Sequence, residues 1–238
     1  MPRILLEVAV TTCDEARLAA EAGADRLELC SALELGGVTP SPGTFLAVRD
    51  AVSLPVYVLL RPRPGGLAYS PGEFETMKRD AEWFVNHGAD GLVFGLLTNE
   101  GRVDGRCADL VAIAKHAVFH RVFDFVPDRL QALEEVIGLG FERILTSGGA
   151  ATAVEGCAEI AKLVRAANGR IEILPGSGIR PDNVAASFQL AGLTQVHASL
   201  RGAAPSRPSA IAQQMGEERT TSAELVRAMR AELDRISR

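Results

Sequence analysis

Short apolar segments alternate with longer amphipathic segments along the whole chain. Eight of the apolar segments have the length and residue types of buried strands. These predicted strands are Ile4–Val8, Arg26–Leu29, Val56–Leu60, Gly91–Phe94, Val118–Val122, Arg143–Thr146, Ile171–Leu174 and Gln195–Ala198. The segments between them read as helices, among them Cys13–Ala22, Pro71–His87, Pro127–Leu139, Ala153–Ala167 and Pro181–Ala191, and a last helix is predicted over Ser222–Ile236. Strands that alternate with helices in this way indicate a parallel sheet.

An internal repeat narrows the fold class. Four predicted strands are entered through similar sequences, in which a helix end meets a strand at a glycine: AEAGADRLEL (20–29), VNHGADGLVF (85–94), GLGFERILTS (138–147) and QLAGLTQVHA (189–198). An open doubly wound sheet also alternates strands and helices, but it seldom repeats eight similar units. We therefore predict an α/β chain with one (β/α)8 TIM barrel as a single domain over residues 1–238. The polar, aperiodic segment 201–221 is predicted to be a long loop after the eighth strand.

Composition excludes several classes of partner. The net charge of −5 and the absence of a basic cluster argue against nucleic acid, and the first apolar run breaks at Glu7, too early for a signal peptide or a membrane span. Four cysteines without a CxxC pair are typical of free thiols in a reducing compartment. We therefore expect a cytoplasmic protein with no nucleic-acid or membrane partner. All three lysines fall on predicted helices, which excludes a Schiff-base aldolase.

Charged residues stand where the predicted strands end, and in a TIM barrel that end carries the site. We expect Glu7, Glu28, His120 and Asp124 to be catalytic, and Arg61, Arg63, Arg121 and His197 to bind a ligand. His120 and Asp124 would both point inward if the fifth strand stays extended. The alternative is structural: the glutamates could pair with arginines that close the barrel mouth, and His197 could be a core residue.

Two glycine turns follow the sixth and seventh predicted strands, TSGG (146–149) and PGSGI (175–179). Glycine allows backbone N–H groups to approach an anion, and many barrels bind phosphate beside strands seven and eight. The predicted anion-binding residues here are Ser147, Gly148, Gly176, Ser177, Gly178 and Ser199. A phosphate or another small molecule at the barrel mouth is the expected partner.

Nine short motifs, in order, resemble the CutC copper-homeostasis family. They are LEV (6–8), GADRLELCSALELGGVTPS (23–41), RPRPGG (61–66), YSPGE (69–73), GADGLVFG (88–95), FHRVFD (119–124), GFERILTSGG (140–149), PGSGI (175–179) and HAS (197–199). The resemblance implies an eight-stranded β/α barrel, a cytosolic and often oligomeric protein, and a role in copper tolerance or trafficking.

The resemblance also names a candidate metal ligand. Cu(I) prefers sulfur, and Cys30 matches the cysteine of the family's ELCS motif, with Met215 as a distant second sulfur. Some relatives carry another cysteine on the first strand, where this chain has Ala9. Two hypotheses follow: a copper-binding protein that uses Cys30, or a barrel enzyme for a phosphorylated or carboxylated metabolite that requires no cofactor.

Overall fold

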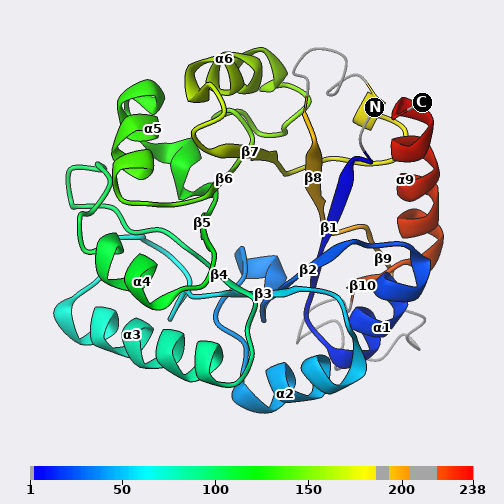
Figure 1. Ribbon diagram of the computed structural model, residues 1–238, viewed down its shortest axis with the longest axis horizontal. Coiled ribbons are helices and arrows are strands. Elements are labelled where there is room, and N and C mark those ends of the chain that lie inside the picture. Colours follow the sequence, from blue (N-terminus) through cyan, green and yellow to red (C-terminus); the bar gives the residue numbers. More distant parts are fainter. Residues whose placement is uncertain (1–2, 186–192, 204–218, 238) are drawn as a thin grey trace, which may run out of the picture.

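Eight parallel strands form a nearly closed barrel in the computed structural model, which describes residues 3–185, 193–203 and 219–237 (Figure 1). The strand order is β7-β6-β5-β4-β3-β2-β1-β8, and neighbours in this order pair in parallel. The strands are β1 (Leu5–Val10), β2 (Arg26–Leu29), β3 (Val56–Leu59), β4 (Gly91–Phe94), β5 (Ala117–Phe119), β6 (Arg143–Thr146), β7 (Glu172–Pro175) and β8 (Gln195–Ala198). The predicted TIM barrel is confirmed.

Helices surround the barrel as an outer ring (Figure 1). Several begin where the sequence provides capping groups: Ser70, for example, caps its helix in a capping box with Glu73, and Pro71 takes the first helical position. No helix within the described ranges has the length and apolar character needed to cross a membrane. The helices are α1 (Cys13–Ala22), α2 (Pro42–Ala51), α3 (Pro71–Asn86), α4 (Cys107–Ile113), α5 (Arg129–Gly138), α6 (Cys157–Ala167) and α9 (Ala223–Ile236), with short 3₁₀ helices η1 (Leu33–Leu35) and η2 (Arg121–Phe125).

The buried apolar residues form two clusters. The larger cluster lies between the strands and the helices. The smaller one consists of alternate strand residues and fills the inside of the barrel: Cys30, Tyr57, Leu59, Val93, Val118, Leu145 and Leu174. Side chains alternate between the two faces of a strand. Glu28, two positions before Cys30, and Arg61, two positions after Leu59, therefore belong to the same inner face.

A side-chain contact joins the two ends of the strand order. Strands β7 and β8 stand at opposite ends of that order, yet they lie side by side in the barrel. The Gln195 side-chain amide of β8 donates to Glu172 Oε2 of β7 at 2.8 Å. Polar groups inside the barrel thus help to close it.

The fifth strand is shorter than predicted. It ends at Phe119, and His120 begins η2 instead of continuing the strand to Val122. The reason is local: the His120 ring accepts a hydrogen bond from the Val122 amide, and Asp124 accepts bonds from the loop after β6. The extended geometry assumed for His120 and Asp124 is therefore wrong, although both side chains are buried.

The segment predicted as a loop over 201–221 is paired at both of its described ends. Arg201–Ala203 (β9) and Arg219–Thr221 (β10) form an antiparallel pair. The buried carboxylate of Glu15 on α1 fixes this strand pair in place. It accepts a hydrogen bond from the Thr221 amide at 3.1 Å and lies 3.4 Å from the Arg201 guanidinium. Met215 and the end of the predicted helix Pro181–Ala191 lie outside the described residues.

Gly91 tests how tightly the barrel interior is packed. A methyl group at Gly91 would lie 2.7 Å from the ring of Tyr57. We expect Gly91→Ala to lower the free energy of unfolding by about 1–3 kcal/mol, measured by urea denaturation, because the filled core has no room for it. Gly72→Ala on α3 is the matched control, since a methyl there meets nothing within 4 Å. Equal stability of the two variants would contradict this packing.

Candidate functional site

A cavity of about 850 Å³ opens at the carboxyl ends of the strands. That volume suits a small metabolite. Its polar wall comes from several strands and the loops after them: Glu28, Arg61, His120, Arg121, Ser177, Gly178, Arg180, His197, Ser199 and Arg201. Its apolar wall includes Leu33, Leu59, Leu67, Val122, Phe125, Leu145 and Ile179.

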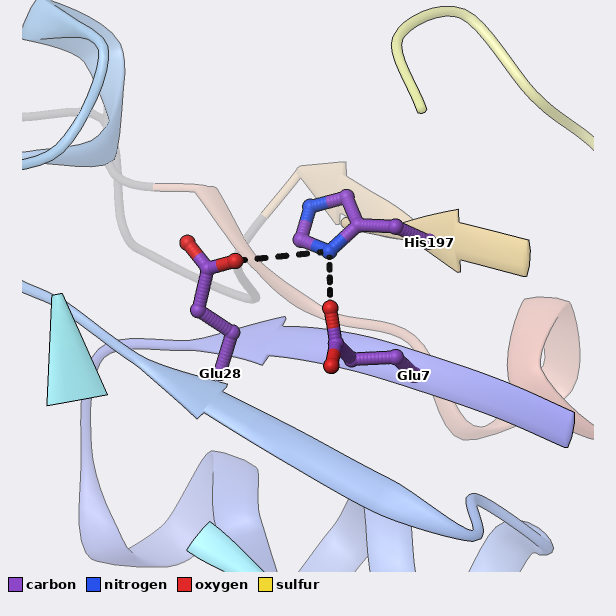
Figure 2. Close-up of side chains that lie close together, drawn as sticks. All are labelled: Glu7, Glu28 and His197. Carbon is purple, nitrogen blue, oxygen red and sulfur yellow. Dashed lines mark hydrogen bonds and ion pairs between the residues drawn. The ribbon is translucent and has the colours of Figure 1, made fainter. Parts of the chain in front are cut away.

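Two glutamates and a histidine from three adjacent strands meet beside this cavity (Figure 2). Strand register brings them together, because Glu7 stands opposite His197 across β1 and β8, and Glu28 lies on the other neighbour of β1. The Nδ1 atom of His197 is 2.8 Å from Glu7 Oε1 and 3.6 Å from Glu28 Oε2. Both carboxylates thus face the same ring nitrogen.

The two glutamates have opposite ionisation. Burial would raise the pKa of Glu7, but Arg26 and His197 outweigh it and hold that pKa at about 2. Burial raises the pKa of Glu28 to about 7, and the charge of His197 offsets only part of that effect. Burial alone would lower the pKa of His197, yet Glu28 and Glu7 raise it above its usual value. Glu7 is therefore a fixed anion, whereas Glu28 and His197 share a proton near neutral pH.

Glu28 also has an unsatisfied acceptor. Its Oε2 atom is buried and has no hydrogen-bond partner, and its carboxylate lines the cavity. A buried oxygen without a partner is costly unless a ligand or a proton satisfies it. The carboxyl group of Glu28 as a whole is thus suited to exchange a proton with a molecule in the cavity.

A polar chain below the site holds Glu7 in place. Arg26 hydrogen-bonds Glu7 through Nε and donates to Gln195 at 3.0 Å. Gln195 in turn donates a hydrogen bond to Glu172, and Glu172 also accepts one from Arg143 at 2.6 Å. Arg26 and Arg143 both lie over the ring of Tyr57, at 5.0 and 5.7 Å from its centroid. These hydrogen bonds and ring contacts explain how buried charges are tolerated inside the barrel.

The sequence analysis did not predict five of the residues around Glu7 as site residues: Arg26, Tyr57, Arg143, Glu172 and Gln195. A signal for some of them was present in the sequence. Arg26 precedes Glu28 by two positions, and Gln195 precedes His197 by two positions. Alternation with period two places each pair on one face of its strand.

His120 lies in the cavity wall as a neutral ring. Burial lowers its pKa to about 4, and the nearby charge of Arg61 acts in the same direction. Its Nδ1 accepts from the Val122 amide at 3.3 Å, which assigns the ring proton to Nε2. A methyl group at Gly95 would come within 2.9 Å of Nδ1, so that edge of the ring packs on the backbone. The other edge, with Nε2–H, is left as the donor side.

Arg61 is a cation held by backbone carbonyls. Its guanidinium donates to the carbonyls of Leu35, Gly37 and Gly65 at 2.7–3.2 Å. Among the ion pairs of the described residues, none neutralises Arg61. These bonds fix the position of the Arg61 guanidinium in the cavity wall, and its role in anion binding stays a prediction.

Arg63 is not brought to the cavity. It pairs with Glu73 and donates to the carbonyl of Gly66 at 2.7 Å. The two arginines of the RPRPGG motif therefore differ: Arg61 lines the cavity, and Arg63 braces the loop that leads to α3.

Asp124 organises the loop after β6 and does not line the cavity. Its carboxylate accepts from the amides of Ser147 and Gly149 and from Arg121 Nε at 2.9–3.1 Å. These bonds satisfy both oxygens, so the structure gives Asp124 a positioning role rather than that of a free acid or base. Arg121 reaches the cavity wall while it donates to the Ser147 hydroxyl at 3.1 Å.

The glycine turns divide into two groups. Ser177, Gly178 and Ser199 line the cavity, whereas Ser147, Gly148 and Gly176 are buried beneath it. Gly148 packs against the Gly156 carbonyl, where an added methyl would lie 2.6 Å from the oxygen. Gly176 gives space to Leu145 and His197.

Cys30 is fully buried among apolar side chains inside the barrel and is not part of the cavity wall. Burial raises the pKa of its thiol, and the neighbouring Glu28 raises it further. Metal binding requires the thiolate. This environment instead favours the protonated thiol, packed as a small apolar group.

Glu7, Glu28 and His197 could together approach a cation. One ligand atom from each lies within 4.8 Å of the others, and no other such group of three occurs in the described ranges. Oxygen and imidazole donors suit harder divalent ions better than Cu(I). Arg26, however, already occupies the second oxygen of Glu7.

The fold and cavity define a parallel β/α barrel with an acid–base pair and an arginine at its mouth. The sequence profile of the CutC family matches residues 4–202, and the chain belongs to this family. A protein of Treponema denticola named as family protein CutC is 49% identical over 83% of this chain and 81% of its own length.

Two further similarities agree with that assignment. The human copper homeostasis protein cutC homolog is 46% identical over 83% of this chain and 73% of its own length. A crystal structure titled as the putative copper homeostasis protein CutC from Streptococcus agalactiae superposes with a TM-score of 0.77 at 31% identity, covering 82% of this chain and 98% of that one.

The proton shared by Glu28 and His197 predicts a pH-dependent stability. Both pKa values are raised in the folded state, so this pair contributes stability that is lost as pH rises from about 5 to 8, whereas the lowered pKa of His120 acts in the opposite direction below its unfolded value of 6.5. We expect Glu28→Gln to remove a fall on the order of 2 kcal/mol, measured by urea unfolding across this range. The control Glu142→Gln changes a half-exposed carboxylate and should keep the wild-type profile. Profiles of the same slope for the wild type and Glu28→Gln would refute the assignment.

Proposed function

We propose that this protein is an enzyme that transfers protons on a small phosphorylated or carboxylated metabolite at the barrel mouth. Glu28 is the group that exchanges the proton, and His197 shares it. Glu7 keeps His197 in orientation through its bond to Nδ1. The observation that carries the proposal is the buried carboxyl group of Glu28, which lines the cavity, has one oxygen without a hydrogen-bond partner and has a pKa of about 7.

Arg61 is the proposed binding group for the anion. It lies in the same cavity wall as Glu28, and its charge has no carboxylate to neutralise it among the described ion pairs. Arg201 and the turn at Ser177 and Gly178 add polar groups elsewhere in the wall. An anionic substrate held at Arg61 would place its reacting carbon in the cavity that Glu28 faces.

The names of the relatives connect them with copper, and the described residues do not fit a Cu(I) site. Cys30 is buried with a raised thiol pKa. Cys13 lies on α1 and donates to the Ala47 carbonyl, and Met77 and Met229 are buried in the layer between strands and helices. Cys107 is buried in the same layer, and Cys157 begins α6. Among the described residues, no second sulfur is therefore placed to complete a site with Cys30, and the proposed chemistry needs no copper.

Copper titration provides a direct test. In a competition assay with a Cu(I) chelator, we expect wild type and Cys30→Ser to retain equally little copper, because the buried thiol has no partner ligand. Cys30→Ser should also lose about 1–3 kcal/mol of stability, since it buries a hydroxyl in an apolar position. Tight binding that is lost with Cys30→Ser would establish the copper role and overturn this view.

Anion binding tests the proposed enzyme site. We expect inorganic phosphate, at about ten times its Kd, to contribute about 1.4 kcal/mol and raise the Tm by about 3–6 °C. The shift should disappear in Arg61→Met and persist in Arg63→Met, a matched control whose arginine lies outside the cavity. Differential scanning fluorimetry with phosphate, phosphoenolpyruvate and ribose 5-phosphate measures this. No shift with any of them would contradict the proposal.

A further inference from the structure

The imidazole of His197 is held at one nitrogen and free at the other. Its Nδ1 is 2.8 Å from Glu7 Oε1, and because Glu7 is a fixed anion, Nδ1 carries the proton of the neutral ring. Nε2 points away from Glu7 (Figure 2), and it has no hydrogen-bond partner among the described residues. The side chain lines the cavity and keeps 12% of its surface exposed, against 1% for Glu7. Nε2 is therefore the atom through which this ring meets a bound molecule.

The turn that follows β7 begins against the same edge of the ring. A methyl group at Gly176 would lie 3.2 Å from His197 Cδ2, the carbon that is bonded to Nε2. Ser177 follows Gly176 directly, so covalent geometry keeps its amide within about 7 Å of that edge. The first residues of this turn and the free nitrogen of His197 thus border the same part of the cavity.

The turn presents three consecutive amides without acceptors. The amides of Ser177, Gly178 and Ile179 have no hydrogen-bond partner among the described residues, whereas the amides on either side of them are bonded. All three residues line the cavity. The turn itself is fixed, because the Ser177 hydroxyl donates to the Ala151 carbonyl and the Gly178 carbonyl accepts from Asn183, both at 3.0 Å. Fixed amides without acceptors are suited to bind an oxygen that gains negative charge.

From these two features we infer that the substrate is an aldehyde or ketone, whose carbonyl oxygen binds the turn after β7 and whose neighbouring C–H group faces His197 Nε2. This inference rests on the proposed function, and it adds the substrate class and the atom that moves the proton. A base beside a set of oxyanion donors is the arrangement that removal of a proton next to a carbonyl requires.

The strand order sets the length of the substrate. Arg61 follows β3 and the turn follows β7, and four strands apart in an eight-stranded barrel means opposite sides of the mouth. Glu28 and His197 come from β2 and β8, which lie between them. An anionic group held at Arg61 and a carbonyl held at the turn therefore belong to opposite ends of one molecule, several bonds apart.

The reaction starts with a neutral His197, since Glu28 holds the proton that the two share. Nε2 takes a proton from the carbon next to the carbonyl, and the electron pair of the broken C–H bond forms a C=C bond. The C=O π pair moves onto the oxygen, where the amides of the turn stabilise the negative charge. Glu7 stabilises the imidazolium that forms. Return of the proton from Nε2 restores the carbonyl, so electrons and charge balance without an oxidant or a metal.

The first test observes the His197 ring in the wild-type protein. Long-range ¹H–¹⁵N spectra, assigned with His197→Gln, report which nitrogen carries the proton. We expect it on Nδ1 of neutral His197, and on Nε2 of His120, whose Nδ1 accepts from the Val122 amide. A neutral His197 with its proton on Nε2, or a ring that is still protonated at about pH 9, would overturn the inference.

The second test measures the binding of erythronohydroxamate 4-phosphate by calorimetry. Its planar hydroxamate resembles an enolate and stands at the opposite end of the molecule from the phosphate, whereas erythritol 4-phosphate lacks that group. We expect the hydroxamate to bind about tenfold or more tightly than erythritol 4-phosphate, because it gains the turn and Nε2 as partners. This difference should vanish in His197→Gln and persist in His116→Gln, whose half-exposed histidine lies outside the cavity wall.

The third measurement needs no variant. In ¹H–¹⁵N spectra of the wild-type protein, saturating hydroxamate should move the amide protons of Ser177, Gly178 and Ile179 downfield, because each gains an acceptor. The amides of Gly176 and Arg180, which are already bonded, should move less. Binding of erythritol 4-phosphate that depends on Arg61, with no gain from the hydroxamate and no change at the three amides, overturns this inference and leaves the proposed function standing. If the wild-type protein binds neither compound, both fail.

Discussion

The buried ion pair between Glu7 and Arg26 is the interaction on which the site depends. Both side chains are almost fully removed from solvent. Taking such a pair out of water is costly, and it is tolerated only when each remaining polar atom finds a partner. Here the partners are His197 on one side and Gln195 on the other. The same bonds that satisfy the pair also orient the histidine that faces Glu28.

The barrel therefore contains two kinds of buried charge. Each charged side chain in the series from Glu7 to Arg143 has a partner and serves to hold geometry, whereas one oxygen of Glu28 has no hydrogen-bond partner among the described residues. Arg61 shows the same contrast with Arg63, which is paired with Glu73. Unpaired groups that share one cavity are the best indication of chemistry, because a purely structural network has no reason to leave them.

The sequence was sufficient to predict the barrel, since the alternation of short apolar with longer amphipathic segments and the glycine entry motifs are local signals. It also led to Glu28, Arg61, His120 and His197, because charges at strand ends are unusual. It did not distinguish Arg61 from Arg63 or Ser177 from Ser147, because those differences depend on loop paths and hydrogen-bond partners. The surroundings of Asp124 were not predicted for a related reason: β5 ends before His120, and the loop after β6 then donates to both oxygens of the Asp124 carboxylate.

The closure of the barrel by its last strand has a consequence for biosynthesis. The bond between Glu7 and His197 joins residues 190 positions apart, and that between Arg26 and Gln195 spans 169. A ribosome-bound chain that has completed β1 to β7 holds an arginine and a glutamate inside an open sheet, with neither β8 partner yet made. Such a chain exposes unpaired sheet edges and apolar surface, which favour aggregation until β8 emerges and closes the barrel.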